Sequence, residues 1–272
     1  MNINRKSNHE QTLRYIYSIL GIGSRYFVSD FPDEGKDISL EGRMKITPYD
    51  REVHDAVVTL HVAGNKIVTP EMVYRAMNGM TESEKLSPQA IDAVTRSMDK
   101  SRYTTLKIDF SQEAQAYKKD CKAIYEGYLL ACDKLTVSTG GRTKEAYRLL
   151  REPILLEYSK ISGQIITVPI KLLQTKGNIR STEDVIVLRG YLLRQIEGMK
   201  SRTFHRINKI AYKSIFTELD ILPDNYANYK EKTRKIREHV IAILGGWVKQ
   251  NYIKNYEQYK NGKKIEGVEI TI

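Results

Sequence analysis

The chain has 272 residues, a formal net charge of +11 and a sequence pI of about 9.4. This length predicts one large domain or two ordinary ones, and 41% hydrophobic with 28% charged residues argues against global disorder. No apolar run approaches the roughly 18 residues of a membrane span, and residues 1–10 are too polar for a signal peptide. We therefore expect a soluble, cytoplasmic protein with no membrane partner.

Residues 1–45 predict a loosely attached N-terminal arm, with one strand at residues 25–28. A first domain is expected at residues 46–175. It opens with three helices, each of which begins at a Ser or Thr followed by Pro: Thr47-Pro48, Thr69-Pro70 and Ser87-Pro88. The hydroxyl can accept a hydrogen bond from a free amide of the first turn, and proline has the backbone angle that a first helical residue needs. A short extended run, residues 66–68, separates the first two helices.

Extended segments follow these helices. Residues 104–110 alternate apolar and polar side chains, which is typical of a strand. Residues 125–137 and 147–158 are expected to pair through a turn at Gly140-Gly141, and residues 165–170 predict a further strand. The order of helix, strand, helix, helix and hairpin is that of a winged helix.

Residues 174–180 are the expected linker to a second domain, residues 181–272. Ser181 or Thr182 predicts the start of a helix, a short amphipathic helix is expected at residues 209–219, and the longest helix at residues 229–250. The turn Asn261-Gly262 then predicts a hairpin between residues 252–259 and 265–272. The predicted fold class is α+β, with two tandem winged-helix domains.

Positive charge gathers in this second domain. Residues 200–264 contain fifteen Lys or Arg against six Asp or Glu, which is +9 of the total of +11. Charge confined to one end indicates a local binding face for a polyanion, because neutralised phosphates release counterions.

The longest helix has two kinds of residue. An apolar face is expected to pack in the core, and it consists of Ile236, Val240, Ile243, Leu244 and Trp247. Basic residues fill the first turns, as in a recognition helix that enters the major groove, and lysines cluster in the hairpin. The candidate DNA-binding residues are Lys209, Lys213, Lys230, Lys232, Thr233, Arg234, Lys235, Arg237, Lys254, Lys260, Lys263 and Lys264. A basic helix face alone is more often a solvated surface, and a lysine-rich hairpin alone is more often an edge strand protected from aggregation. Because the two features follow each other directly in this chain, they favour DNA binding.

Catalytic and metal sites are not indicated. Cys121 and Cys132 are too far apart for a CxxC motif, and His54 and His61 have no third ligand nearby. The chain has no GxxxxGK[ST] motif for a nucleotide. We expect no enzyme activity, no metal and no cofactor.

The arrangement resembles the two-winged-helix replication initiators of theta-replicating plasmids and related mobile elements. The resemblance rests on residues 46–50 (Ile-Thr-Pro-Tyr-Asp), on the helices through Met98, and on residues 191–194 (Tyr-Leu-Leu-Arg) through the final hairpin. It implies that the second domain binds origin repeats, that the first mediates homodimerisation, and that host replication proteins are partners. It also implies base contacts by Thr233, Arg234 and Arg237, with Lys230, Lys235, Lys263 and Lys264 on phosphates.

Three functions stay open at this point. The first is a replication initiator of a plasmid or mobile element, and the second is a winged-helix transcriptional regulator. The third is a non-enzymatic adaptor whose basic hairpin binds an acidic protein.

Overall fold

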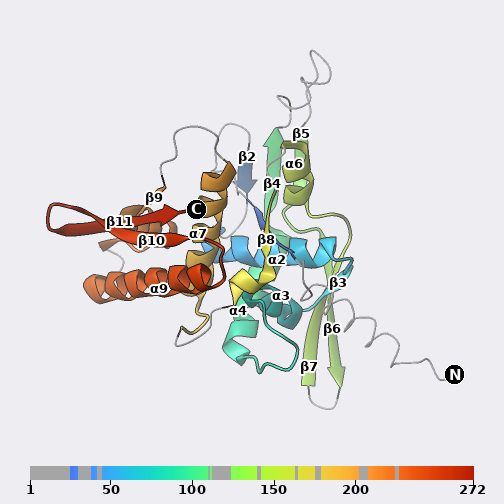
Figure 1. Ribbon diagram of the computed structural model, residues 1–272. Coiled ribbons are helices and arrows are strands. Elements are labelled where there is room, and N and C mark those ends of the chain that lie inside the picture. Colours follow the sequence, from blue (N-terminus) through green and yellow to red (C-terminus); the bar gives the residue numbers. More distant parts are fainter. Residues whose placement is uncertain are drawn as a thin grey trace. The chain divides into compact units, whose positions relative to one another are not determined.

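The computed structural model describes two compact units, residues 1–171 and 172–272, and each mixes helices with small antiparallel sheets (Figure 1). The mixed α+β class that the sequence predicts is confirmed. The described residues are 25–29, 38–41, 45–109, 111, 124–139, 142–162, 165–174, 179–201, 208–223 and 227–272. Within these ranges, no helix has both the length and the apolar character needed to cross a membrane.

The first unit contains the three helices that the sequence predicts. They are α2 (Pro48–Val62), α3 (Pro70–Asn78) and α4 (Pro88–Tyr103). The Thr47 hydroxyl accepts from the Asp50 amide at 3.3 Å, while the Asp50 carboxylate accepts from the Thr47 amide at 2.7 Å. This reciprocal pair satisfies two amides at the start of α2. At α3 the Thr69 hydroxyl accepts from the Met72 amide at 3.3 Å without a return bond, whereas Ser87 makes no capping bond at α4.

The strands of the first unit form three small sheets. The strands are β1 (Arg25–Ser29), β2 (Ile38–Glu41), β3 (Ile67–Val68), β4 (Thr105–Asp109), β5 (Ile124–Tyr128), β6 (Cys132–Thr139), β7 (Arg142–Leu149) and β8 (Ile165–Pro169). Their orders are β1-β8, β2-β4-β5 and β3-β7-β6. The predicted hairpin is therefore β6–β7, and the short strand β3 extends its sheet beside β7. The predicted turn Gly140-Gly141 lies outside the described residues.

Two strands lie within the segment predicted as an N-terminal arm, and the first of them was predicted at residues 25–28. Residues 25–29 pair with β8 and residues 38–41 pair with β4, both antiparallel. Their backbone groups are hydrogen-bonded to strands that follow more than sixty residues later in the chain. Local sequence could not show this, because such pairing depends on partners that are distant in sequence.

Two expectations about the predicted hairpin are also corrected. Residues 154–158 are not strand but belong to the helix α6 (Ile154–Ser162). The Pro153 carbonyl accepts from the amides of Leu156 and Glu157, which closes the first helical turn. Residues 124–128 form β5, which pairs with β4 instead of joining the hairpin. A 3-10 turn, η1 (Ile170–Leu173), follows β8.

The second unit has the order of helix, short strand, two helices and hairpin (Figure 1). The first unit has the same order, except that β4 and β5 stand between its third helix and its hairpin. Its elements are α7 (Glu183–Ser201), β9 (Lys209–Ala211), α8 (Tyr212–Glu218), α9 (Tyr229–Lys249), β10 (Asn255–Asn261) and β11 (Lys264–Thr271). The sheet order is β10-β11-β9, so the short strand again pairs with the last strand of the hairpin. Most of the predicted linker, residues 175–178, lies outside the described residues.

The core of the second unit forms where the apolar faces predicted from helical spacing are buried. Val185, Leu188, Leu192 and Ile196 of α7 are fully buried, as is the predicted face of α9. Trp247 is 2% exposed, and its indole Nε1 donates to the Leu172 carbonyl at 3.0 Å. The hydroxyl of Thr182 accepts from the Val185 amide at 3.4 Å, which caps α7 as predicted.

Two boundaries in this unit differ from the prediction. Residues 209–211 form the strand β9, and the helix α8 begins only at Tyr212, because Lys209, Ile210 and Ala211 pair with β11. The hairpin turn is Gly262-Lys263, one residue later than predicted, since Asn261 pairs with Lys264. Gly262 has φ +59°, a region in which glycine is favoured.

Gly267 lies where β11 crosses closest to β9. A Cβ atom there would lie 2.2 Å from the Ile210 carbonyl oxygen and 2.6 Å from the Tyr259 ring. Both distances are far shorter than a carbon can tolerate, and a backbone oxygen cannot rotate away. Glycine at this position therefore lets the hairpin dock against the rest of the unit.

We expect Gly267→Ala to lower the free energy of unfolding of the second unit by about 1–3 kcal/mol, because the added methyl forces the two strands apart. Fluorescence of Trp247, the only tryptophan of the chain, follows this unit in urea. Gly246→Ala is the matched control, since an added Cβ there meets nothing within 4 Å and α9 gains helix propensity, about 0.5–1 kcal/mol. If both substitutions changed the free energy of unfolding equally, glycine at position 267 would not be needed for the close approach of β11 to β9.

The burial of His54 predicts that the first unit loses stability in acid. Its side chain is 2% exposed, and burial lowers the pKa to about 4 from 6.5. The folded state thus binds fewer protons than the unfolded state between these values, so stability present above pH 6.5 is lost as the pH falls. We expect a loss of about 2 kcal/mol between pH 7 and pH 5. Urea denaturation followed by circular dichroism checks this, and a His54→Gln variant with the same pH profile would contradict it.

Candidate nucleic-acid interface

A groove in the second unit gathers basic side chains from three elements. It has a volume of about 740 Å³ and lies among α8, the first turns of α9 and the start of β11. Lys213 of α8, Lys230 and Arg237 of α9 and Lys264 of β11 all line it. Thr233 of α9 lines it as well, so the structure brings together five of the twelve predicted DNA-binding residues, four of which are cations.

The floor of this groove is apolar and aromatic. It includes Tyr212, Phe216, Leu222, Pro223 and Ile265. The rings of Tyr212 and Phe216 stack with centroids 6.1 Å apart, one helical turn from each other on α8. The sequence argument placed Phe216 in an amphipathic helix but missed this floor. The spacing of two aromatic residues by four positions was the signal that could have indicated it.

Arg237 is positioned by that aromatic floor. Its guanidinium carbon lies 5.3 Å from the Tyr212 ring centroid and 5.7 Å from that of Phe216. Cation–π contacts of this kind restrict a long side chain while leaving the charge at the groove. Arg237 is thus a cation held in a defined place before any ligand arrives, which lowers the entropy lost on binding.

Thr233 lines the groove but exposes little of its side chain. It is 5% exposed, and its hydroxyl donates to the carbonyls of Tyr229 at 2.9 Å and Lys230 at 3.0 Å within its own helix. The hydroxyl is therefore used inside α9, and a contact of Thr233 with thymine methyl groups stays a prediction.

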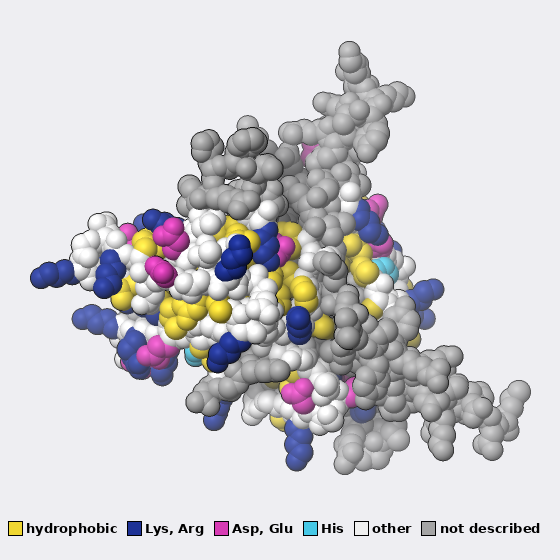
Figure 2. Space-filling model, viewed as in Figure 1, with side chains coloured by type: hydrophobic (Ala, Val, Ile, Leu, Met, Phe, Trp, Pro, Cys, Tyr) yellow, Lys and Arg dark blue, Asp and Glu magenta, His cyan; other side chains and the backbone are white. Residues whose placement is uncertain are grey.

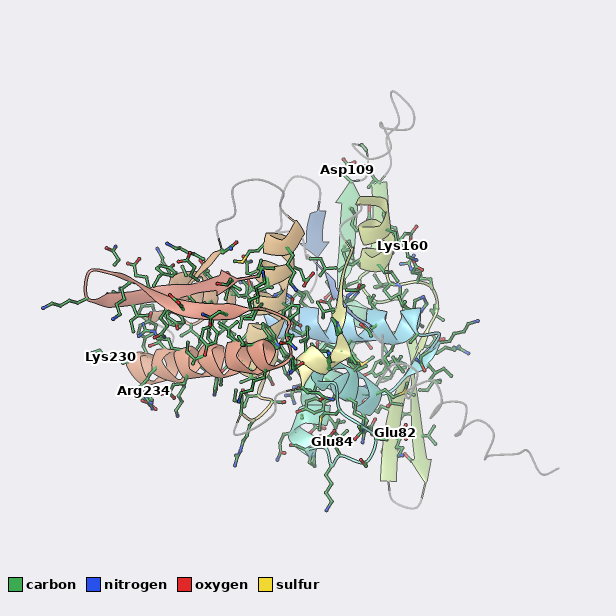
Figure 3. The ribbon with its side chains drawn as sticks, viewed as in Figure 1. Glu82, Glu84, Asp109, Lys160, Lys230 and Arg234 are labelled. Carbon is green, nitrogen blue, oxygen red and sulfur yellow. The ribbon has the colours of Figure 1, made fainter. Side chains whose placement is uncertain are left out.

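The outer face of α9 carries basic residues that are paired with carboxylates. Arg234 binds Glu231 and Glu238, Lys235 lies 3.5 Å from Glu231, and Lys232 forms an ion pair with Asp184 of α7. The side chains of Arg234 and Lys235 are 56% and 59% exposed, so both remain accessible. Figure 3 shows Lys230 and Arg234 projecting from the N-terminal part of this helix.

The hairpin supplies a second group of cations. Lys260, Lys263 and Lys264 are exposed at or next to its turn. Lys209 of β9 lies 3.6 Å from Glu269 and 5.2 Å from the Tyr259 ring centroid, while Lys254 is exposed just before β10. Dark-blue side chains stand out in Figure 2 over the end of the unit formed by the hairpin and the first turns of α9, with magenta carboxylates among them.

Two tyrosines of the C-terminal hairpin region form hydrogen bonds inside the unit. The Tyr252 hydroxyl donates to Glu197 at 2.7 Å, with the Lys200 ammonium 3.5 Å from the ring centroid. Burial and this carboxylate raise the pKa of Tyr252. The Tyr256 hydroxyl donates to the Ile241 carbonyl at 3.2 Å. These two hydroxyls fix the hairpin to α7 and α9 and do not face a ligand.

Metal ligands are not clustered in the described part of the chain. No group of three or more His, Cys, Asp or Glu side chains there is arranged to hold an ion. His54 is buried in α2. Cys132 is buried too, and its burial raises the pKa of the thiol to about 11. Cys121 lies outside the described residues.

Comparison with known proteins identifies no family. No family model matches the chain, and no curated protein matches it significantly. Among solved structures, two crystal structures of domains 2 and 3 of RctB align with 91% of this chain and with 91% and 90% of theirs. Sequence identity is 14% in both, and the TM-scores are 0.47 and 0.45. Scores below 0.5 at this identity do not establish a common fold.

Proposed function

We propose that the chain is a double-stranded DNA-binding protein of two tandem winged helices, in which the second unit recognises a specific sequence. The order of helix, short strand, two helices and hairpin supports the winged-helix assignment, with β4 and β5 added before the hairpin of the first unit. The sheet orders β3-β7-β6 and β10-β11-β9 support it as well. In this fold the third helix enters the major groove and the hairpin contacts the flanking backbone. In the second unit these elements are α9 and β10–β11.

The observation that carries the proposal is the set of four cations around one groove. Lys213, Lys230, Arg237 and Lys264 come from three elements, and the apolar floor between them gives a ligand a surface to pack on. Phosphates neutralised by such cations release counterions, which drives binding. The aromatic contacts of Arg237 and the exposed hairpin lysines suit base and backbone contacts respectively.

More specifically, we propose a replication initiator of a plasmid or mobile element, as the resemblance of the sequence implies. The second unit would bind repeated origin sites, and the first would support a homodimer and contacts with host replication proteins. The role is non-enzymatic and cytoplasmic. A transcriptional regulator uses the same DNA contacts, so the genomic arrangement of the bound sequence separates the two. Tandem copies beside an AT-rich segment favour initiation, and a single palindrome at its own promoter favours regulation.

Selection of bound duplexes from a random library tests sequence-specific binding. We expect a defined motif with the wild-type chain, and its loss with Lys230→Ala plus Arg237→Ala, because both cations line the groove. The salt dependence of binding should also weaken, with the slope of log K against log salt reduced by about two.

The control for this pair is Lys85→Ala plus Lys249→Ala. It removes the same charge from exposed positions, and Lys249 lies at the far end of α9, about 18 Å along the helix from Arg237. The control should retain the motif. No motif from the wild-type chain, with retained binding to acidic proteins, would reject DNA recognition and favour the adaptor.

Thr233→Val separates packing from recognition. Its hydroxyl bonds only within α9, so we expect the free energy of unfolding to fall by about 1 kcal/mol. The affinity for the selected duplex should stay within about twofold, because no base contact is removed. Titration of labelled duplex, together with urea denaturation, measures both quantities. A large loss of sequence preference would contradict this, since it would assign a base contact to the hydroxyl of Thr233.

A further inference from the structure

Arg234 is held between two carboxylates of its own helix. Its Nη2 donates to Glu231 Oε1 at 2.7 Å and its Nε donates to Glu231 Oε2 at 3.0 Å, so the carboxylate binds the guanidinium in a bidentate manner. On its other side, Nη1 donates to Glu238. The three residues stand at i, i+3 and i+7, so the arginine lies between its partners along one face of α9.

The bonds leave a defined part of the guanidinium available. An arginine has five N–H groups, one on Nε and two on each terminal nitrogen. The three bonds to Glu231 and Glu238 use one on each nitrogen. One N–H on Nη1 and one on Nη2 therefore remain. Two N–H groups side by side match O6 and N7 of a guanine in the major groove.

Two exposed carboxylates stand on the basic face of α9, where they reduce its positive charge. Glu231 and Glu238 are exposed, at 48% and 58%, on a helix whose other exposed residues are largely basic. Arg234 lowers the pKa of Glu231, so that carboxylate stays charged. A negative charge brought close to DNA phosphates reduces the affinity for every sequence. Its benefit must then lie in something other than general affinity.

We propose that Glu231 and Glu238 are positioning residues that fix the base specificity of Arg234. They hold its guanidinium in one orientation, so that its two remaining N–H groups contact a guanine. By charge repulsion they also lower the affinity for every sequence, and only the site with the matching guanine recovers it through Arg234. This inference rests on the proposed entry of α9 into the major groove, and it assigns one guanine of the bound site to Arg234.

The experiment compares base preference and general affinity in the full-length chain. The variants are Arg234→Ala, Glu231→Gln plus Glu238→Gln, and the triple combination. Glu82→Gln plus Glu126→Gln is the control, since these exposed carboxylates of the first unit remove the same charge. Each variant is titrated with the selected duplex, with duplexes carrying every base pair at each guanine position, and with random duplex.

The two-glutamine variant should bind random duplex several-fold more tightly, while its preference for one guanine falls roughly tenfold. Arg234→Ala should lose the preference at that same position, and the triple variant should lose no more than Arg234→Ala. A purely structural role for the glutamates would not move the preference at a single base pair. The control should change neither the affinity for random duplex nor the preference for that guanine.

Three other results would overturn the inference in distinguishable ways. A guanine preference that survives Arg234→Ala removes the base contact, although sequence-specific binding itself stands. A preference lost in Arg234→Ala but kept in the two-glutamine variant removes the role of the carboxylates alone. The absence of any motif from the wild-type chain rejects this inference together with the proposed function.

Discussion

The close pairing of β11 with β9 is the constraint on which the second unit depends. It passes through Gly267, where any side chain would collide with the Ile210 carbonyl. Because β9 leads directly into α8, this contact fixes the hairpin beside the helices that carry Tyr212 and Arg237. The groove exists only because three elements meet there, and the strand pairing is what brings the third of them. Backbone geometry at one glycine thus determines where the basic side chains gather.

The cations on the surface of the second unit are held in place in two different ways. Around the groove, the cations are placed by packing, as Arg237 is by its aromatic neighbours. On the outer face of α9, they are placed by ion pairs within the helix or with α7. Exposed ion pairs contribute little to stability, typically 0–1 kcal/mol. Their effect on the direction in which an arginine points matters more for recognition than their effect on folding.

The two units share an order of elements but use charge differently. In the first unit, Asp99 of α4 accepts from Lys134 of β6 at 2.6 Å and from the Tyr147 hydroxyl of β7 at 3.0 Å. Lys134 also lies 3.1 Å from Glu145. The third helix of that unit therefore binds its own hairpin through charged and polar side chains. The same topology can hold a closed polar network or an open basic surface.

Helix positions and buried faces followed from the sequence alone, because caps such as Thr47 with Asp50 and the spacing from Ile236 to Trp247 are local signals. The concentration of charge in the second unit was equally visible. Tertiary structure alone decided that the N-terminal segments 25–29 and 38–41 join sheets, that residues 154–158 turn helical, and that Thr233 faces inward. It also decided which five of the twelve candidate residues surround one groove. Strand partners and side-chain neighbours are set by contacts between residues far apart in the chain, and no local pattern encodes them.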